Sequence, residues 1–261
     1  MGINTRRLKR KLKKRLKSKR WWLKYVGTAL LAVATIFVVG AALKGPTPEP
    51  ATVALPAVTS TPSETPQAKS PKVAFMGDSY TSGVGSTSKS SRWTTLLAAQ
   101  LGWEELNYGQ GGSGFTGRGV STDGTDKLSY PEMIPAVVSA KPDMVVVATA
   151  GNDFNRGPES FEPAIAKFFT DLRAGLPTAK IVVVSPMWRG PESHEHLPEL
   201  AAALKGGALS VKGTFVDIGS DFQTSYADGL LGADSIHPND RGHAELAAEV
   251  AAAYKATTSA K

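Results

Sequence analysis

Five short apolar runs rich in β-branched residues alternate with longer segments of helical periodicity in the last two thirds of the chain. The runs predict β-strands at residues 73–76, 105–108, 144–150, 181–185 and 215–218. The other segments predict helices at residues 92–101, 131–140, 159–176, 198–209 and 241–255. Because strands that alternate with helices form parallel sheets covered on both faces, the pattern predicts a three-layer α/β/α domain with a five-stranded parallel sheet over residues 72–261.

The first part of the chain has a different pattern. Residues 25–43 form a run of 19 residues without a charge, preceded by Trp21 and Trp22. This length is close to the roughly 20 apolar residues that cross a bilayer as a helix, and paired tryptophans suit the headgroup region. Residues 1–24 carry 12 Lys or Arg and no Asp or Glu. Because basic flanks stay in the cytoplasm, we predict a basic cytoplasmic arm (1–24) and a single transmembrane helix that acts as a signal anchor (25–43).

A cleaved signal peptide is the alternative for this segment, since small residues at positions 39–42 are of the cleavage type. Its apolar region usually has only about 7 to 15 residues, so the length favours the anchor. Residues 44–71 then form a Pro/Thr/Ser-rich linker: positions 45–71 hold seven prolines and no aromatic residue. Such a segment cannot bury a core and is expected to be an extended tether. The domain would lie outside the cytoplasm, bound to the membrane or, after cleavage, secreted.

The net charge of +7 belongs to this basic arm. With 12 of the 30 Lys and Arg residues in positions 1–24, the rest of the chain has 18 against 23 Asp and Glu. The arm therefore predicts lipid contact and topology, and a nucleic-acid partner is not expected. The absence of cysteine excludes disulfides, thiolate nucleophiles and zinc fingers. Any nucleophile must be oxygen or nitrogen.

Polar residues gather where the predicted strands end, which is where ligands bind in parallel sheets. Singly, each group is compatible with a turn or a helix cap. Together they provide a serine hydroxyl, an imidazole, a carboxylate and N–H donors, the groups that nucleophilic acyl transfer needs. Four blocks carry them: Gly77-Asp78-Ser79, Asn107 to Gly112, Gly151-Asn152-Asp153, and Asp234-x-x-His237.

In order and spacing, these four blocks resemble those of the SGNH (GDSL-type) hydrolases, over residues 72–255. The resemblance implies the flavodoxin-like fold of that family, with Ser79 as nucleophile, His237 as general base and then acid, and Asp234 as its partner. It also implies an oxyanion hole made by the backbone N–H groups of Ser79 and Gly112 and the side chain of Asn152. Gly112 is chosen because it lies five residues after Asn107, while Gly109 and Gly111 in the same run stay open. Tyr80 stands where the family's other name has leucine, which leaves the nucleophile intact.

The resemblance predicts a serine esterase that hydrolyses acyl or acetyl esters of carbohydrate, peptidoglycan or lipid through an acyl-serine intermediate, with no cofactor and no metal. An acyltransferase that uses the same site to modify an envelope glycan is the alternative, and a non-catalytic envelope-binding module is a third hypothesis. The ester and the oligomeric state stay open.

The remaining histidines have simpler interpretations. His194 and His196 form a His-x-His pair, for which an exposed loop is favoured over a metal site because no third ligand is visible. His243 is expected to be a surface or packing residue of the last helix. Trp188 could either line a substrate pocket or pack in the core.

Overall fold

The computed structural model of the 261-residue chain describes residues 69–119, 126–149, 151–188, 195–219 and 229–259. The predicted basic arm, the predicted membrane span and most of the linker lie outside these ranges. In the helices within them, no stretch is long and apolar enough to cross a membrane.

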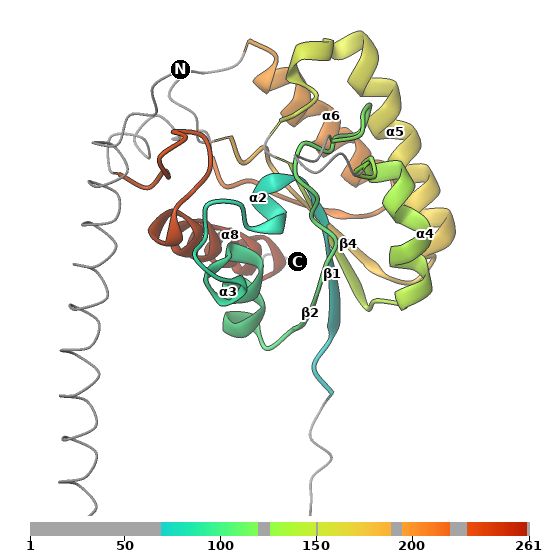
Figure 1. Cartoon of the computed structure of the whole chain (residues 1–261). Helices are drawn as coiled ribbons and strands as arrows, with labels where there is room; N and C mark the ends of the chain where they lie inside the picture. Colours follow the sequence, from blue (N-terminus) through green and yellow to red (C-terminus); the bar gives the residue numbers. More distant parts are fainter. Residues whose placement is uncertain (1–68, 120–125, 150, 189–194, 220–228, 260–261) are drawn as a thin grey trace, which may run out of the picture. The chain divides into compact units, whose positions relative to one another are not determined.

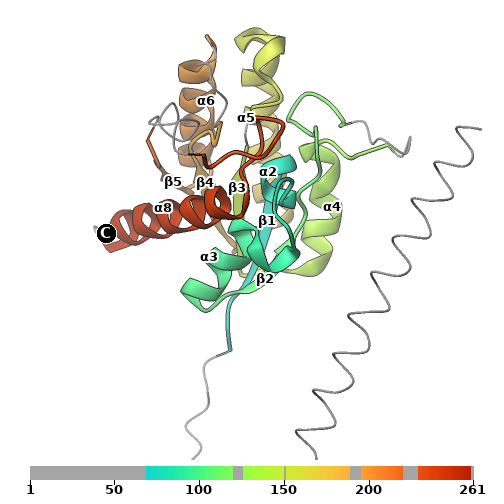
Figure 2. The ribbon, with the colours of Figure 1, turned by 60° about the vertical axis from the view of Figure 1, so that its left-hand side comes forward.

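All five predicted strands are confirmed, and they form one parallel sheet (Figure 1). The strand order is β2-β1-β3-β4-β5 (Figure 2). The strands are β1 (Lys72–Gly77), β2 (Glu104–Asn107), β3 (Met144–Ala148), β4 (Lys180–Val184) and β5 (Thr214–Val216). The third strand ends two residues earlier than predicted. There the Gly151 N–H donates to the Thr149 hydroxyl (3.1 Å), so the chain turns away from the sheet.

The predicted helices are also confirmed, and they cover both faces of the sheet (Figure 2). They are α3 (Trp93–Leu101), α4 (Tyr130–Ala140), α5 (Pro158–Gly175), α6 (Leu197–Ser210) and α8 (Asp240–Ser259). Helices α4, α5 and α6 pack on one face, while α3 and α8 pack on the other. A short helix, α2 (Ser79–Ser82), follows β1 directly.

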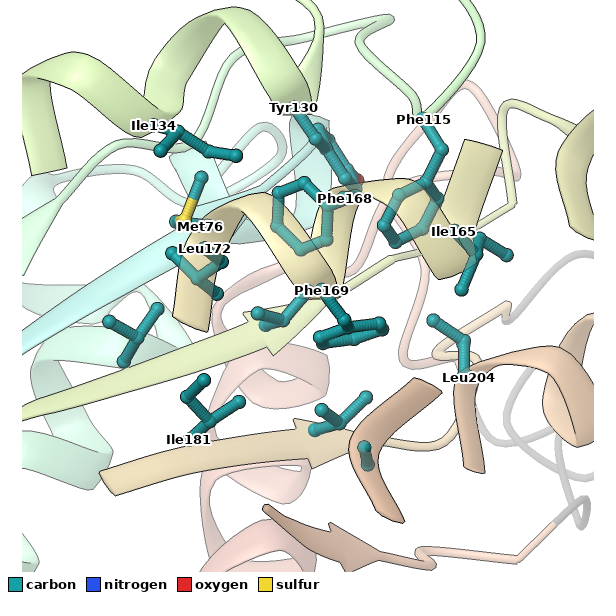
Figure 3. Packing of buried hydrophobic residues seen from close by; sticks show 14 of the residues in the cluster. Met76, Phe115, Tyr130, Ile134, Ile165, Phe168, Phe169, Leu172, Ile181 and Leu204 are labelled. Atoms are coloured by element: carbon teal, nitrogen blue, oxygen red, sulfur yellow. The ribbon is translucent and has the colours of Figure 1, made fainter. Parts of the chain in front are cut away.

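Central strands of this sheet are buried on both faces, which explains their continuous apolar sequence. In β1, Val73 and Phe75 pack on the α3 and α8 side, while Ala74 and Met76 pack on the opposite side. The second side holds an aromatic group around Phe168, the ring of which lies 5.2 Å from that of Phe115 and 5.1 Å from that of Phe169, centroid to centroid (Figure 3). Edge-to-face contacts of this kind add to the apolar burial that stabilises the sheet.

Strand order decides where the functional residues meet. Since β1 lies between β2 and β3, the residue that follows β1 is flanked by the loops that follow β2 and β3. All three loops leave from the carboxyl edge of the sheet, the edge where ligands bind in folds of this kind.

Candidate active site

Ser79, the predicted nucleophile, is the first residue of α2 and is partly exposed. The turn from β1 into this helix is tight, because a Cβ on Gly77 would overlap the Thr81 hydroxyl and the Ala148 carbonyl oxygen. Asp78 is fully buried, and its carboxylate caps α2 by accepting a hydrogen bond from the Tyr80 N–H (3.0 Å). The serine hydroxyl is therefore held at the end of the central strand on a short, capped helix.

The loop after β2 is fixed to this turn. Gln110 donates its backbone N–H to the Gly77 carbonyl (3.0 Å). The side-chain amide of Asn107 donates to the Thr81 carbonyl (2.7 Å) and to the Thr94 hydroxyl (2.9 Å). Asn107, which spacing alone marked as the start of a block, thus joins β2, α2 and α3.

The glycine run that follows borders Ser79. A Cβ on Gly111 would lie 3.8 Å from the Ser79 Cβ, so this glycine faces the nucleophile with nothing larger than hydrogen. Gly112, the donor predicted from spacing, comes next with φ +77°, a backbone conformation that favours glycine. The role of Gly112 as donor stays a prediction, and the neighbouring Gly111 stays open as an alternative.

The loop after β3 joins the two preceding loops. The Thr149 hydroxyl donates to the buried Asp78 carboxylate (3.3 Å). The Asn152 side-chain amide donates one N–H to the Ser113 carbonyl (2.8 Å). Because an amide NH₂ has two protons, the second N–H of the exposed Asn152 can serve a ligand.

Asp153 has a role that its position in the sequence did not indicate. Its side chain is 1% exposed and accepts hydrogen bonds from the Phe115 N–H (2.9 Å), the Thr116 N–H (2.9 Å) and the Thr116 hydroxyl (2.6 Å). A Cβ on Gly114 would come within 2.6 Å of the same carboxylate. Asp153 therefore fixes the backbone of the glycine-rich loop by hydrogen bonds, whereas the sequence had suggested only a turn former.

The structure pairs Asp234 with His237. The carboxylate accepts a hydrogen bond from His237 Nδ1 (2.7 Å) and two from the backbone N–H groups of Ile236 and His237 (3.0 Å each). Burial opposes its ionisation, but these hydrogen bonds outweigh it and lower the pKa of Asp234 to about 2. The ionised carboxylate fixes the imidazole proton on Nδ1, so Nε2 carries the lone pair that can accept a proton.

This pair lies against the nucleophile's helix. The imidazole ring of His237 is 5.8 Å from the ring of Tyr80, the residue after Ser79. A Cβ on Gly85 would lie 3.2 Å from the Cβ of His237. The four predicted blocks, up to 160 positions apart in the chain, thus form one connected group at the carboxyl edge of the sheet.

The other histidines lie outside this group. His243 is fully buried and joins α8 to α3 and to the loop after α2: its Nδ1 accepts from the Trp93 N–H (3.4 Å) and its Nε2 contacts the Val84 carbonyl (3.1 Å). His196 pairs with Glu195 (3.3 Å), and His194 lies outside the described residues. Among the residues that the structure describes, no group of three His, Asp or Glu side chains could hold a metal ion. The Trp188 ring meets that of Phe154 at 6.2 Å and packs at the margin of the core.

A cavity of about 760 Å³ lies at the opposite edge of the sheet, at the start of β4 and β5. Arg173, which lines it together with Lys180 and Lys212, donates to the carbonyls of Leu176, Ala179 and Val211 and so stabilises the surrounding turns. The serine, histidine and carboxylate that acyl transfer requires lie at the other edge, so we assign the candidate site there.

Residues 75–245 match the family model described as GDSL-like Lipase/Acylhydrolase family. The chain belongs to this family. As a GDSL-family protein it is a hydrolase that acts on ester bonds, which confirms the predicted enzyme class.

Comparison with individual proteins is consistent with this family assignment. The chain is 29% identical over 187 residues to the GDSL lipase Rv0518 of Mycobacterium tuberculosis, covering 69% of this chain and 79% of that one. Among solved structures, it resembles TesA (TM-score 0.54, 21% identity, 71% of this chain and 99% of that one). It also resembles the native aryl esterase of M. smegmatis (TM-score 0.53, 20% identity, 72% of this chain and 100% of that one). These two structures support the fold.

Proposed function

We propose that the protein is a serine esterase that cleaves acyl or acetyl esters through an acyl-serine intermediate on Ser79. The observation that carries this proposal is the Asp234–His237 pair, with its 2.7 Å hydrogen bond, placed against the helix that begins with Ser79. A hydroxyl, an imidazole oriented by an ionised carboxylate and a run of N–H donors at one sheet edge are the groups that ester cleavage uses.

In the first step, Ser79 Oγ attacks the ester carbonyl carbon and passes its proton to His237 Nε2. The oxyanion that forms accepts hydrogen bonds from the N–H groups of Ser79 and Gly112 and from the Asn152 amide. The tetrahedral intermediate then expels the alcohol, which takes the proton from His237, and leaves the acyl group on Ser79. Asp234, ionised because its pKa is about 2, stabilises the imidazolium in both steps.

The second half repeats this chemistry with water. A water molecule gives its proton to His237 Nε2 and attacks the acyl-serine carbonyl, and Ser79 leaves with that proton. The proton of Ser79 leaves with the alcohol and is replaced by a proton from water, so Ser79 and His237 end the cycle in their starting protonation states. If a sugar hydroxyl replaces the water, the same residues perform acyl transfer to a glycan.

We further propose that the domain works outside the cytoplasm, held at the membrane by residues 25–43. The uncharged run of 19 residues, the basic segment before it and the proline-rich linker after it support this arrangement. Esters of envelope polysaccharide, peptidoglycan or lipid are then the accessible substrates. Alkaline extraction tests the anchor, since the full chain should stay in the membrane pellet, while release as a shorter chain that begins near residue 42 would indicate a cleaved signal peptide.

The activity is tested with the full chain in mild detergent and p-nitrophenyl acetate as substrate. Wild-type protein should show a burst of nitrophenol, and acid quenching should trap one acetyl group on the peptide that holds Ser79. Ser79→Ala should abolish both signals, whereas Ser90→Ala, at an exposed serine, should change neither. Adding a chito-oligosaccharide distinguishes the two reactions: acetylated sugar in place of acetate would favour the transferase.

A further inference from the structure

The residue after the nucleophile is bonded to the residue before the base. The Tyr80 hydroxyl donates a 2.6 Å hydrogen bond to the backbone carbonyl of Ile236, 156 positions away in the chain. Tyr80 directly follows Ser79, and Ile236 directly precedes His237. This bond therefore joins the two halves of the proposed catalytic site directly. Farther from the two reacting residues, Thr87 also binds the Asp240 carboxylate through its N–H (2.7 Å) and its hydroxyl (2.6 Å).

Tyr80 is itself firmly fixed. Its side chain is 1% exposed and belongs to the buried cluster on the α3 and α8 side of the sheet. Its backbone is held at both ends, since its N–H donates to Asp78 (3.0 Å) and its carbonyl accepts from the Trp93 indole N–H (3.0 Å). The hydroxyl is thus presented from a rigid support.

The loop on the other side of the bond has less support from the core. The Ile236 side chain is 42% exposed and the Asp234 side chain 48% exposed. Bonds within the loop shape it locally, such as the one from the Gly232 N–H to the His237 carbonyl (2.8 Å). Bonds of that kind set the conformation of the loop, but they do not set its distance from Ser79.

The peptide group between Ile236 and His237 is held from both sides. Tyr80 binds its carbonyl oxygen at 2.6 Å, and Asp234 binds its N–H at 3.0 Å. A peptide group is planar, so these two bonds together fix its plane and hence the Cα from which the imidazole projects. Hydrogen bonds on opposite ends of one peptide also polarise and strengthen each other.

We propose that Tyr80 is a positioning residue, the hydroxyl of which holds the His237 loop at the distance from Ser79 that proton transfer requires. The inference rests on the proposed function of Ser79 and His237. A leucine, which gives the family its other name, has no hydroxyl and cannot make this bond. Tyr80 therefore performs in this chain a task that the leucine motif must leave to other contacts.

The test compares Tyr80→Phe and Tyr80→Leu with wild-type full-length protein. Tyr80→Phe keeps the ring and removes the hydroxyl. Tyr254→Phe is the matched control, because it removes a tyrosine hydroxyl on α8 at the cavity on the opposite edge of the sheet. We measure kcat and KM for p-nitrophenyl acetate, the rate of Ser79 modification by a fluorophosphonate, and hydrogen exchange of the peptide that covers residues 230–238.

Tyr80→Phe should lower kcat and the modification rate about five- to tenfold with KM unchanged, as expected for one buried hydrogen bond that acts on the reacting geometry. Hydrogen exchange in residues 230–238 should be faster, and Tyr254→Phe should match wild type in every measurement. Tyr80→Leu should lower kcat and the modification rate at least as much as Tyr80→Phe does.

Unchanged kcat in Tyr80→Phe, or unchanged exchange in residues 230–238, would overturn the inference. A parallel rise in KM would also overturn it, because it would place Tyr80 in substrate binding. A wild-type protein that is neither active nor modified at Ser79 would overturn the proposed function itself, and with it the positioning role, so the two failures are distinguishable.

Discussion

Asp234 binds His237 twice, through the imidazole Nδ1 at 2.7 Å and through the backbone N–H at 3.0 Å. One carboxylate thus fixes both the main chain and the ring of the same residue. The two residues are three positions apart in the chain, which makes this double contact possible within one tight turn. The ring can therefore neither rotate nor exchange tautomers without breaking a bond to a charged group.

Replacing Asp234 with Asn should lower kcat by about 100-fold or more, because the neutral amide neither fixes the Nδ1 proton nor stabilises the imidazolium. Asp217→Asn, at a carboxylate that contacts the Gly219 N–H, is the control and should keep wild-type activity. Steady-state kinetics at neutral pH measure the effect. An Asp234→Asn protein with wild-type turnover would remove Asp234 from the site.

The depressed pKa of Asp234 also predicts a pH dependence of stability. A folded-state pKa of about 2, against 3.8 for an unperturbed group, means that the hydrogen-bonded carboxylate contributes stability above pH 3.8. That contribution is lost as the pH falls toward 2. Urea unfolding of wild type and Asp234→Asn should therefore differ most above about pH 4 and converge below it; a difference that grows with acid would contradict the assignment.

Asn152→Ala should reduce kcat about 100-fold with little change in KM, since a donor aimed at the oxyanion acts mainly in the transition state. Asn155, three residues later and exposed, provides the matched control Asn155→Ala. An equal loss in both variants, or a loss confined to KM, would show that Asn152 is not an oxyanion donor.

Asp153→Ala should destabilise the domain by about 2 to 3 kcal/mol, because two backbone N–H groups and one hydroxyl lose a buried charged acceptor. Asp171→Ala, at an exposed carboxylate paired with Lys167, should cost less than about 1 kcal/mol. Denaturant unfolding measures both. Equal stability of the two variants would contradict the anchoring role of Asp153.

The buried His243 predicts a second pH dependence of stability, at a higher pH than that of Asp234. Burial lowers the pKa of His243 below the usual 6.5, against the opposing effects of the Val84 carbonyl and of Asp240, while nearby His237 adds to the lowering. The neutral ring therefore contributes stability that is complete above about pH 6.5 and is lost as the pH falls. Thermal unfolding between about pH 7.5 and 5 should show a smaller loss in His243→Gln than in wild type or in the control His196→Gln. Identical pH dependence of stability in all three proteins would contradict this role of the neutral His243.

Much of the fold follows from the sequence because its elements are strongly patterned. The alternating strands and helices carry their periodicity locally, so β1 and α5 were predictable within about a residue or two. The order β2-β1-β3-β4-β5 was not, because strand neighbours depend on long-range packing that periodicity does not encode.

The candidate site, like the fold, could be predicted from the sequence only in part. Ser79, Asp234 and His237 stood out because acyl transfer needs their chemical types, and the structure gathers their elements at one sheet edge. The supporting contacts were not predictable: Asp153 resembled a turn former, and Tyr80 resembled a substitution without consequence. Their partners, Phe115, Thr116 and Ile236, are distant in the chain and chemically ordinary, so only the folded geometry identifies them.

The most direct test of the account is fluorophosphonate labelling of the full chain, with the modified residue located by mass spectrometry. We predict stoichiometric modification of Ser79 and its loss in Ser79→Ala, and a rate lower by at least about 100-fold in His237→Ala. Modification of a different serine, or a folded wild-type protein that does not react, would contradict an activated Ser79 nucleophile.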